Sequence, residues 1–243
     1  MRRIAGELTI RTVNLRELMF RIKICGVRFK NDVDAVEQSG ADAIGLNFFP
    51  PSIRYVDPAA PATYELAAAA NSAGLLRVGV FVNTSVDQMT TIADTVGLDV
   101  IQLHGDETVS IAQALLAEGR RIIRAIKLPR RAMSVNEIES IAGPWSAIGI
   151  HLLLDADAGS AHGGSGKTLH WASIARWAEQ AGPDRWTLAG GLKPENIAEA
   201  VRTSHASSID TASGVECPKG VKNEGRIFAF ASNSGLSPQR DHA

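Results

Sequence analysis

Short apolar runs rich in β-branched residues alternate eight times with segments of helical pattern along this chain of 243 residues. Several of the runs are apolar throughout, which is typical of parallel strands that are covered on both faces. Eight strand-then-helix units predict an α/β protein that forms a single closed (β/α)8 barrel of the TIM type. The strands are expected at residues 21–26, 43–49, 76–83, 100–105, 121–128, 150–156, 186–191 and 207–214.

The segments between the runs carry helix start and stop signals. Residues 85–88 read Ser-Val-Asp-Gln, which fits a capping box, and Gly97 is placed to end the helix that follows. An open, doubly wound sheet is the alternative fold, but no G-x-G-x-x-G motif follows the first strand. The other helices are expected near residues 31–39, 58–73, 106–118, 134–141, 171–180, 194–201 and 223–230.

The two ends of the chain depart from this pattern. Residues 1–18 belong to no unit, and we expect them to be a poorly ordered extension or to precede a true start at Met19. Residues 19–230 are expected to form the barrel. Residues 231–243 are small and polar, so we expect a flexible C-terminal tail.

Charge and cysteine content narrow the functional class. A net charge of −1 gives no reason to expect a nucleic acid partner. Two cysteines in a chain of this length make no disulfide framework, which indicates a reducing compartment such as the cytoplasm. No apolar run approaches the roughly 18 residues of a membrane-spanning helix, so no membrane partner is expected. The sequence leaves open whether the protein is a monomer or a homodimer.

Two reactive side chains follow apolar strands at the end where barrels of this type carry their chemistry. Cys25 ends the first strand ahead of Gly26, and a thiol whose pKa is modestly lowered is a usable base or nucleophile at neutral pH. Asp155 ends the sixth strand after three leucines, and a carboxyl group partly shielded from water suits a general acid. The alternatives are a structural buried cysteine and an aspartate that caps a loop. We take Cys25 and Asp155 as the candidate catalytic pair.

Glycine-rich turns indicate a phosphate site. Residues 163–168 resemble a Walker A loop, but Ala161 stands where that motif requires glycine. We interpret the stretch, which includes Gly164, as a flexible loop whose backbone N–H groups can meet an anion. Gly190-Gly191 and Ser213-Gly214 end the seventh and eighth strands, and phosphate-binding barrels hold their phosphate in the loops after these strands.

Further polar residues are expected around the mouth of the barrel. Arg54, on the loop after the second strand, can clamp a carboxylate through its guanidinium fork. Gln102 and His104 on the fourth strand and Asp210 in the eighth are expected to face the same opening. No cluster of His, Cys, Asp and Glu has the spacing of a metal site, so neither a metal nor another cofactor is expected.

Taken together, these motifs resemble the phosphoribosylanthranilate isomerase family, enzymes of tryptophan biosynthesis that catalyse an Amadori rearrangement. The resemblance extends over residues 20–230 and rests on several long motifs in the right order. They are KICG (23–26), SGADAIGLNFFP (39–50), RVGVFVN (77–83), IQLHGDE (101–107), LLLDA (152–156), GGSGKT (163–168), LAGGLKPENI (188–197) and D-x-x-SGVE (210–216).

The resemblance implies a small phosphorylated substrate and a role for each candidate residue. Cys25 would be the general base that takes the C2′ proton of the ribose-derived imine, and Asp155 the general acid that protonates the ring oxygen. Arg54 would hold the anthranilate carboxylate, and Asp210 would line the pocket. The phosphate would lie among Gly164, Gly190, Gly191, Ser213 and Gly214.

One departure from the family pattern lies near the expected phosphate site. The usual D-V-S-S-G reads Asp-Thr-Ala-Ser-Gly at residues 210–214, which removes one hydroxyl group. The alternatives are a related sugar isomerase of the histidine pathway, a P-loop nucleotide-binding protein, and a catalytically silent phosphate-binding barrel. The first resembles this chemistry but has Asp where Cys25 stands, and the last is expected to have lost one member of the acid–base pair.

Overall fold

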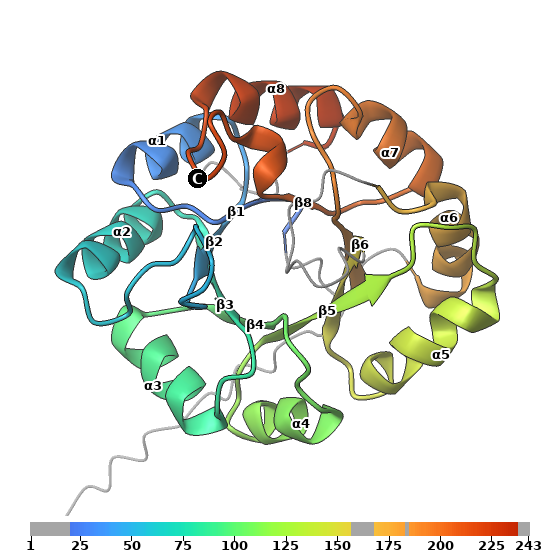
Figure 1. Cartoon of the computed structure of the whole chain (residues 1–243), viewed down its shortest axis with the longest axis horizontal. Coiled ribbons are helices and arrows are strands. Elements are labelled where there is room, and N and C mark those ends of the chain that lie inside the picture. The colour runs from blue at the N-terminus through green and yellow to red at the C-terminus, as the bar shows by residue number, and fades with distance from the viewer. Residues whose placement is uncertain (1–19, 157–167, 183–184, 238–243) are drawn as a thin grey trace, which may run out of the picture.

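Eight parallel strands form a closed barrel in this protein. The computed structural model describes residues 20–156, 168–182 and 185–237 of the chain. Neighbouring strands pair in sequence order, and β1 (Ile22–Cys25) pairs with β8 (Ile209–Thr211) to close the ring. Helices surround the barrel on its outside (Figure 1). The predicted (β/α)8 fold is therefore confirmed, while residues 1–18 lie outside the described part of the chain.

The strands and helices alternate along the whole described chain. No helix in its described ranges is long and apolar enough to span a bilayer. The other strands are β2 (Ala43–Asn47), β3 (Leu76–Phe81), β4 (Val100–Leu103), β5 (Ile122–Leu128), β6 (His151–Ala156) and β7 (Trp186–Leu188). The helices are α1 (Lys30–Gln38), α2 (Pro61–Ser72), α3 (Val86–Val96), α4 (Val109–Ala117), α5 (Val135–Ser146), α6 (Trp171–Ala181), α7 (Ile197–Ser204) and α8 (Glu224–Ser234).

Strand alternation decides which side chains enter the barrel. On β1, Ile22 and Ile24 belong to the large apolar core that includes the helices. Successive side chains of a strand point to opposite faces, so Lys23 and Cys25 point into the barrel. The same alternation on β4, β6 and β8 sends three further polar side chains inward, namely Gln102, Asp155 and Asp210.

An apolar cluster forms the floor of the barrel interior. Full burial of a Val, Leu, Ile or Phe side chain contributes about 1.5–3 kcal/mol, so the larger members of this cluster stabilise the closed barrel. The residues that contribute to it come from several strands and from the segment before β1, and they leave the opposite, C-terminal end for polar groups. They are Phe20, Ala43, Val78, Val100, Ile123, Ala125, Leu153 and Ala189.

Helix α5 extends beyond the end expected from the sequence. The Gly-Pro pair after residue 141 predicts a stop, yet the helix continues through Pro144 to Ser146. Trp145 explains the continuation, because its side chain is buried against the barrel. The guanidinium carbon of Arg124 lies 4.5 Å from the centre of the Trp145 ring, which adds a cation–π contact.

Helix α8 also extends past its expected end, so the prediction of a flexible tail from residue 231 places the end of the helix too early. The helix runs to Ser234, and Phe230 and Ala231 are buried in the main core. Gly235 ends the helix with a φ of 67°, a conformation that glycine adopts without strain.

Candidate active site

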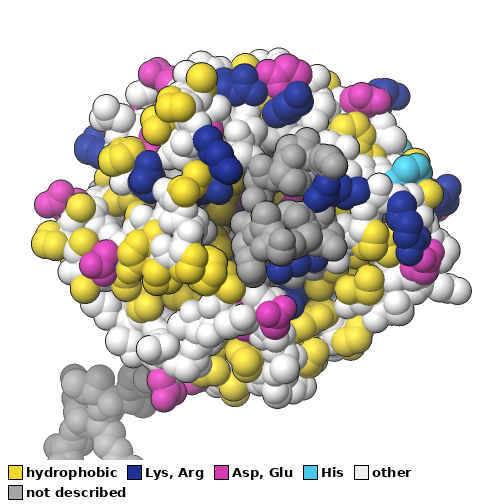
Figure 2. Space-filling model, viewed as in Figure 1, with side chains coloured by type: hydrophobic (Ala, Val, Ile, Leu, Met, Phe, Trp, Pro, Cys, Tyr) yellow, Lys and Arg dark blue, Asp and Glu magenta, His cyan; other side chains and the backbone are white. Residues whose placement is uncertain are grey.

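A cavity of about 460 Å³ opens at the C-terminal ends of the strands. On this face of the barrel, Lys and Arg side chains lie near the centre (Figure 2). Gly214 is not among the described residues that line the cavity, and Gly164 lies outside the described residues. The cavity brings together the other nine residues predicted for the site: Cys25, Arg54, Gln102, His104, Asp155, Gly190, Gly191, Asp210 and Ser213.

Cys25 extends into the cavity from the end of β1, in a space that two glycines keep open. A Cβ atom at Gly45, its partner on β2, would lie 2.6 Å from the Cys25 sulfur. Gly26 has a φ of 76°, and a Cβ there would collide with the Arg54 side chain. These glycines therefore let the thiol and the guanidinium group approach each other.

Burial raises the pKa of the Cys25 thiol above its ordinary value. Lys23 acts against this effect, Asp210 reinforces it, and Lys222 and Arg54 act against it. The sequence suggests a modestly lowered pKa for this thiol, whereas the net shift in the structure is upward. The reason is that the thiol has lost most of its contact with water, and an apolar surrounding disfavours the thiolate.

Asp155 faces His104 across the cavity. The Asp155 Oδ2 atom lies 3.5 Å from His104 Nε2, and both side chains are 17% exposed. On the other side of the ring, Gln102 Nε2 lies 3.0 Å from His104 Nδ1. An amide nitrogen only donates, so this contact leaves the proton of a neutral imidazole on Nε2, directed at Asp155. Gln102 and His104 therefore orient the carboxyl group of Asp155 within the cavity.

Arg54 lies where the sequence predicts a carboxylate clamp, but its fork already holds a carboxylate of the protein. Its Nε and Nη2 atoms donate to the two oxygens of Glu216, at 2.6 and 2.8 Å. Glu216 also accepts from the Gly220 N–H at 2.8 Å and from Lys222 Nζ at 3.0 Å. Burial acts to raise the pKa of Glu216, but the Arg54 hydrogen bonds, the Lys222 charge and the Gly220 N–H bring it to about 2.

The loops after β7 and β8 form the end of the cavity predicted to take a phosphate. Gly190 and Gly191 have φ values of 80° and 68°, so the chain turns there in a conformation that favours glycine. Gly214 has a packing role instead, because a Cβ there would collide with the Leu192 carbonyl oxygen. The Thr211 hydroxyl donates to the same carbonyl at 2.7 Å and ties the two loops together.

Three charged residues of the site were not singled out by the sequence analysis. The side chains of Lys23, Lys222 and Glu216 are buried. Lys23 contacts Asp210 and Glu216 contacts Arg54, both predicted site residues, while Lys222 binds Glu216. A signal existed for Lys23, since a lysine two residues before Cys25 on an apolar strand must point to the same side. Glu216 and Lys222 lie on the loop after β8, and their pairing depends on how that loop folds back. No group of His, Cys, Asp and Glu among the described residues could hold a metal ion.

Comparisons with known proteins show which family the chain belongs to. A family model described as N-(5'phosphoribosyl)anthranilate (PRA) isomerase matches residues 22–233. This chain belongs to that family. The N-(5'-phosphoribosyl)anthranilate isomerase of Acinetobacter calcoaceticus is 38% identical over 212 residues, which span 86% of this chain and 94% of the relative. That of Rhodospirillum rubrum is 38% identical over 214 residues, with the same coverage.

Solved structures of the phosphoribosylanthranilate isomerase family share the fold. The crystal structure of the enzyme from Thermotoga maritima has a TM-score of 0.76 and 30% identity, and the match covers 89% of this chain and 98% of that one. A second crystal structure holds reduced 1-(o-carboxyphenylamino)-1-deoxyribulose 5-phosphate. Its TM-score is 0.73 at 29% identity, with coverage of 89% and 98%.

Proposed function

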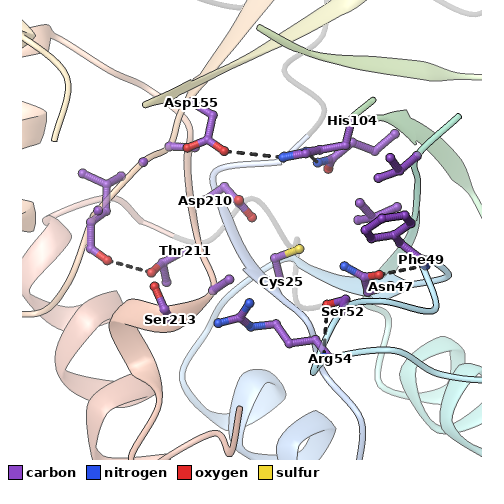
Figure 3. A pocket seen from close by; sticks show the side chains of 18 of the residues that line it. Cys25, Asn47, Phe49, Ser52, Arg54, His104, Asp155, Asp210, Thr211 and Ser213 are labelled. Carbon is purple, nitrogen blue, oxygen red and sulfur yellow. Dashed lines mark hydrogen bonds and ion pairs between the residues drawn. The ribbon is translucent and has the colours of Figure 1, made fainter. Parts of the chain in front are cut away.

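We propose that this chain converts N-(5'-phosphoribosyl)anthranilate into 1-(2-carboxyphenylamino)-1-deoxyribulose 5-phosphate, an Amadori rearrangement in tryptophan biosynthesis. The observation that carries the proposal is that one cavity holds a thiol from β1 and a carboxyl group from β6 on different sides (Figure 3). An isomerisation of this kind needs one group to give a proton and another to take one, both within reach of a single small substrate.

The proposed reaction begins at Asp155. Its carboxyl group gives a proton to the ring oxygen of the ribose, the bond from this oxygen to C1′ breaks, and the nitrogen lone pair forms an imine with C1′. Asp155 lines the cavity and contacts His104, and its place within reach of a bound sugar supports its assignment as the acid.

Cys25 then acts on the opened sugar. The thiolate takes the C2′ proton, and the electrons of that bond form a C1′=C2′ double bond while the imine becomes an amine. The resulting enolamine tautomerises to the ketone. Lys23, Lys222 and Arg54 surround the sulfur and favour the thiolate, which supports the assignment of Cys25 as the base.

The substrate's two anionic groups would fix its position. We assign the phosphate to the loops at Gly190-Gly191 and Ser213, where the backbone turns tightly beside the cavity. We assign the anthranilate carboxylate to the Nη1 side of Arg54, because its Nε and Nη2 atoms bind Glu216. This guanidinium lies beside Cys25 in the cavity (Figure 3). Holding both ends in this way supplies the positioning that lowers the barrier, an effect worth several kcal/mol.

No cofactor enters this proposal, since proton transfer by two side chains is sufficient. We further propose a cytoplasmic location and a monomer or homodimer. The phosphoribosylanthranilate isomerase of Thermotoga maritima is dimeric, which supports the homodimer as one of the two proposed states.

Turnover of the proposed substrate tests the function. Phosphoribosylanthranilate is generated from anthranilate and phosphoribosyl pyrophosphate, and its fluorescence decay is followed with and without the purified chain. We expect decay well above the spontaneous rate, without added metal or nucleotide. A folded sample that leaves the spontaneous rate unchanged would contradict the proposal.

A further inference from the structure

Lys23 is a fully buried lysine directly below the proposed base. It precedes Cys25 by two residues on β1, so both side chains point into the barrel, one above the other. Its side chain is 0% exposed, and its Nζ atom lies 2.7 Å from Asp210 Oδ1. The strand register places Asp210 of β8 beside Lys23. Lysine is rarely buried without a partner, so this contact of ammonium, carboxylate and thiol needs an explanation.

Asp210 does not satisfy the Lys23 ammonium on its own. Lys23 Nζ and Asp210 Oδ1 are close, but they are not aligned for a hydrogen bond, so the N–H donors of Lys23 remain without an acceptor among the described residues. Ala43, which lies beside Lys23 on β2, is apolar and offers the Lys23 ammonium no partner. Burial lowers the pKa of Lys23, but the charges of Asp210 and Cys25 outweigh it, and the net shift is upward. Cys25 lies on the same face of β1, and its sulfur thus offers the ammonium a second electrostatic interaction.

The charges around Cys25 leave room for one more negative charge. The groups that face the thiol are Lys23 on β1, Asp210 on β8, Lys222 after β8 and Arg54 after β2. Glu216 is bound to both Arg54 and Lys222. Three cations therefore face two carboxylates, and a thiolate at Cys25 brings this buried cluster to neutrality. Buried charge is costly when it is uncompensated, so the cluster favours the ionised thiol.

We propose that Lys23 is a positioning residue of the reaction, which holds its buried ammonium against Cys25 so that this side chain can carry the negative charge of a base. Asp210 opposes it, because its carboxylate draws the ammonium away from the sulfur and repels the thiolate. The inference rests on the proposed role of Cys25 as the base. It also assigns the two inward charged residues opposite effects on one thiol.

The rate at which iodoacetamide alkylates Cys25 measures how much of the thiol is ionised, and it needs no substrate. The experiment uses the full chain with Cys217→Ser, because Cys217 is the other free cysteine and is exposed. The alkylation rate is measured against pH for this parent and for Lys23→Met, Asp210→Asn and Lys222→Met in the same background. Circular dichroism and Tm establish that each variant is folded.

We expect Lys23→Met to move the midpoint of the alkylation profile upward by at least one pH unit. At a fixed pH below the midpoint, this shift corresponds to an alkylation rate about tenfold lower. Asp210→Asn is expected to move it downward. Lys222→Met is a matched control that removes a more weakly acting cation, and its upward shift is expected to be smaller. An unchanged or lower midpoint in folded Lys23→Met would overturn the proposal. If Lys23→Met does not fold, absence of a downward shift in Asp210→Asn overturns it instead.

The pH profile of isomerase kcat/KM separates this inference from the proposed function. If Cys25 is the base, the rising limb of the profile moves with the alkylation midpoint in each variant. A midpoint that moves while the rising limb stays in place upholds the role of Lys23 toward the thiol and contradicts Cys25 as the base. Absence of isomerase activity in the parent, with the alkylation shifts present, contradicts the proposed function alone.

Discussion

The two sides of the cavity are built in different ways. On the β1 side, Cys25 lies among buried charges, and the side chains of Lys23 and Glu216 are 0% and 1% exposed. On the β6 side, Asp155 and His104 are each 17% exposed and are connected by one contact of 3.5 Å. The proposed base is therefore enclosed by an ion cluster, while the proposed acid lies at a more exposed position with a short chain of contacts through His104 to Gln102.

Because of this difference, the two sides of the cavity are expected to contribute differently to the stability of the fold and to the catalytic rate. The ion cluster on the β1 side also holds the loop after β8 against the barrel, because Glu216 binds both Arg54 and the Gly220 N–H. The acid side contributes little to the fold beyond orienting Asp155. We therefore expect changes on the β1 side to affect both the free energy of unfolding and catalysis, and changes on the β6 side to affect catalysis alone.

The largest expected effect on rate is at the acid. Asp155→Asn removes the proton donor but keeps the shape, so kcat should fall by about 10²–10⁴-fold, as for other general acids. The free energy of unfolding should stay within about 0.5 kcal/mol, since no buried ion pair is broken. Fluorescence turnover and urea unfolding measure the two quantities. Near wild-type kcat would remove Asp155 from the mechanism.

Glu216→Gln on the β1 side should change stability most. It leaves the guanidinium of Arg54 and the ammonium of Lys222 without their carboxylate, and breaking a buried pair in this way costs about 3–5 kcal/mol. KM should rise as well, because Arg54 loses the partner that orients it. Urea unfolding at neutral pH checks the first effect, and loss of stability similar to that of Asp155→Asn would remove the contrast between the two sides.

The pH dependence of unfolding sharpens the same prediction. The pKa of Glu216 is lowered to about 2, while a glutamate in an unfolded chain has a pKa of about 4.3. The stability from this carboxylate is therefore fully present above the unfolded value and is lost as the pH falls through it toward about 2. Between those limits, the wild type should lose stability with acid more steeply than Glu216→Gln. Parallel acid profiles would contradict the assignment.

A smaller effect is expected from Gln102→Leu on the acid side. This change removes the donor to His104 Nδ1, so the ring no longer holds its proton toward Asp155. We expect kcat to fall by about tenfold, because this factor corresponds to the free energy of roughly one hydrogen bond, and we expect little change in KM. Steady-state kinetics measure both. A change confined to KM would place Gln102 in substrate binding rather than in orientation of the acid.

The smallest effect is expected at the phosphate end. Ala212 lines the cavity, and at this residue the chain departs from the D-V-S-S-G pattern of the resemblance, which has a serine hydroxyl there. Ala212→Ser restores that hydroxyl and should lower KM a few-fold, since one added hydrogen bond is worth about 0.5–1.5 kcal/mol. Ala212→Val is the matched control, which adds volume without a donor and should not lower KM. An unchanged KM in Ala212→Ser would remove this residue from the phosphate site.

The sequence predicts the barrel and the strand-end positions of Cys25 and Asp155 because both depend on local pattern and on chain order. Apolar runs fix the strands, and the last residues of parallel strands meet at one end of the barrel. Helix ends were harder: α5 passes through Pro144, and the residue that follows, Trp145, is buried. Such burial depends on a tertiary contact that the local sequence does not contain.

The ion pairs were the other part that the sequence could not supply. Arg54 and Glu216 are 162 residues apart, and their contact depends on the path of two loops. The sequence therefore predicted a free guanidinium where the structure has a paired one. In the same way, a cysteine at a strand end gave no means of weighing its burial against the cations around it.

A crystal structure of this chain with reduced 1-(o-carboxyphenylamino)-1-deoxyribulose 5-phosphate would locate the ligand against both proposed catalytic residues. We expect Cys25 Sγ about 3–3.5 Å from the carbon that takes part in proton transfer, and Asp155 facing the oxygen of the former ring on the other side of the sugar. The phosphate should lie against Gly190-Gly191 and Ser213, with the carboxylate beside Arg54. A ligand bound in the reverse direction, with its phosphate at Arg54, would contradict the assignment of both the base and the acid.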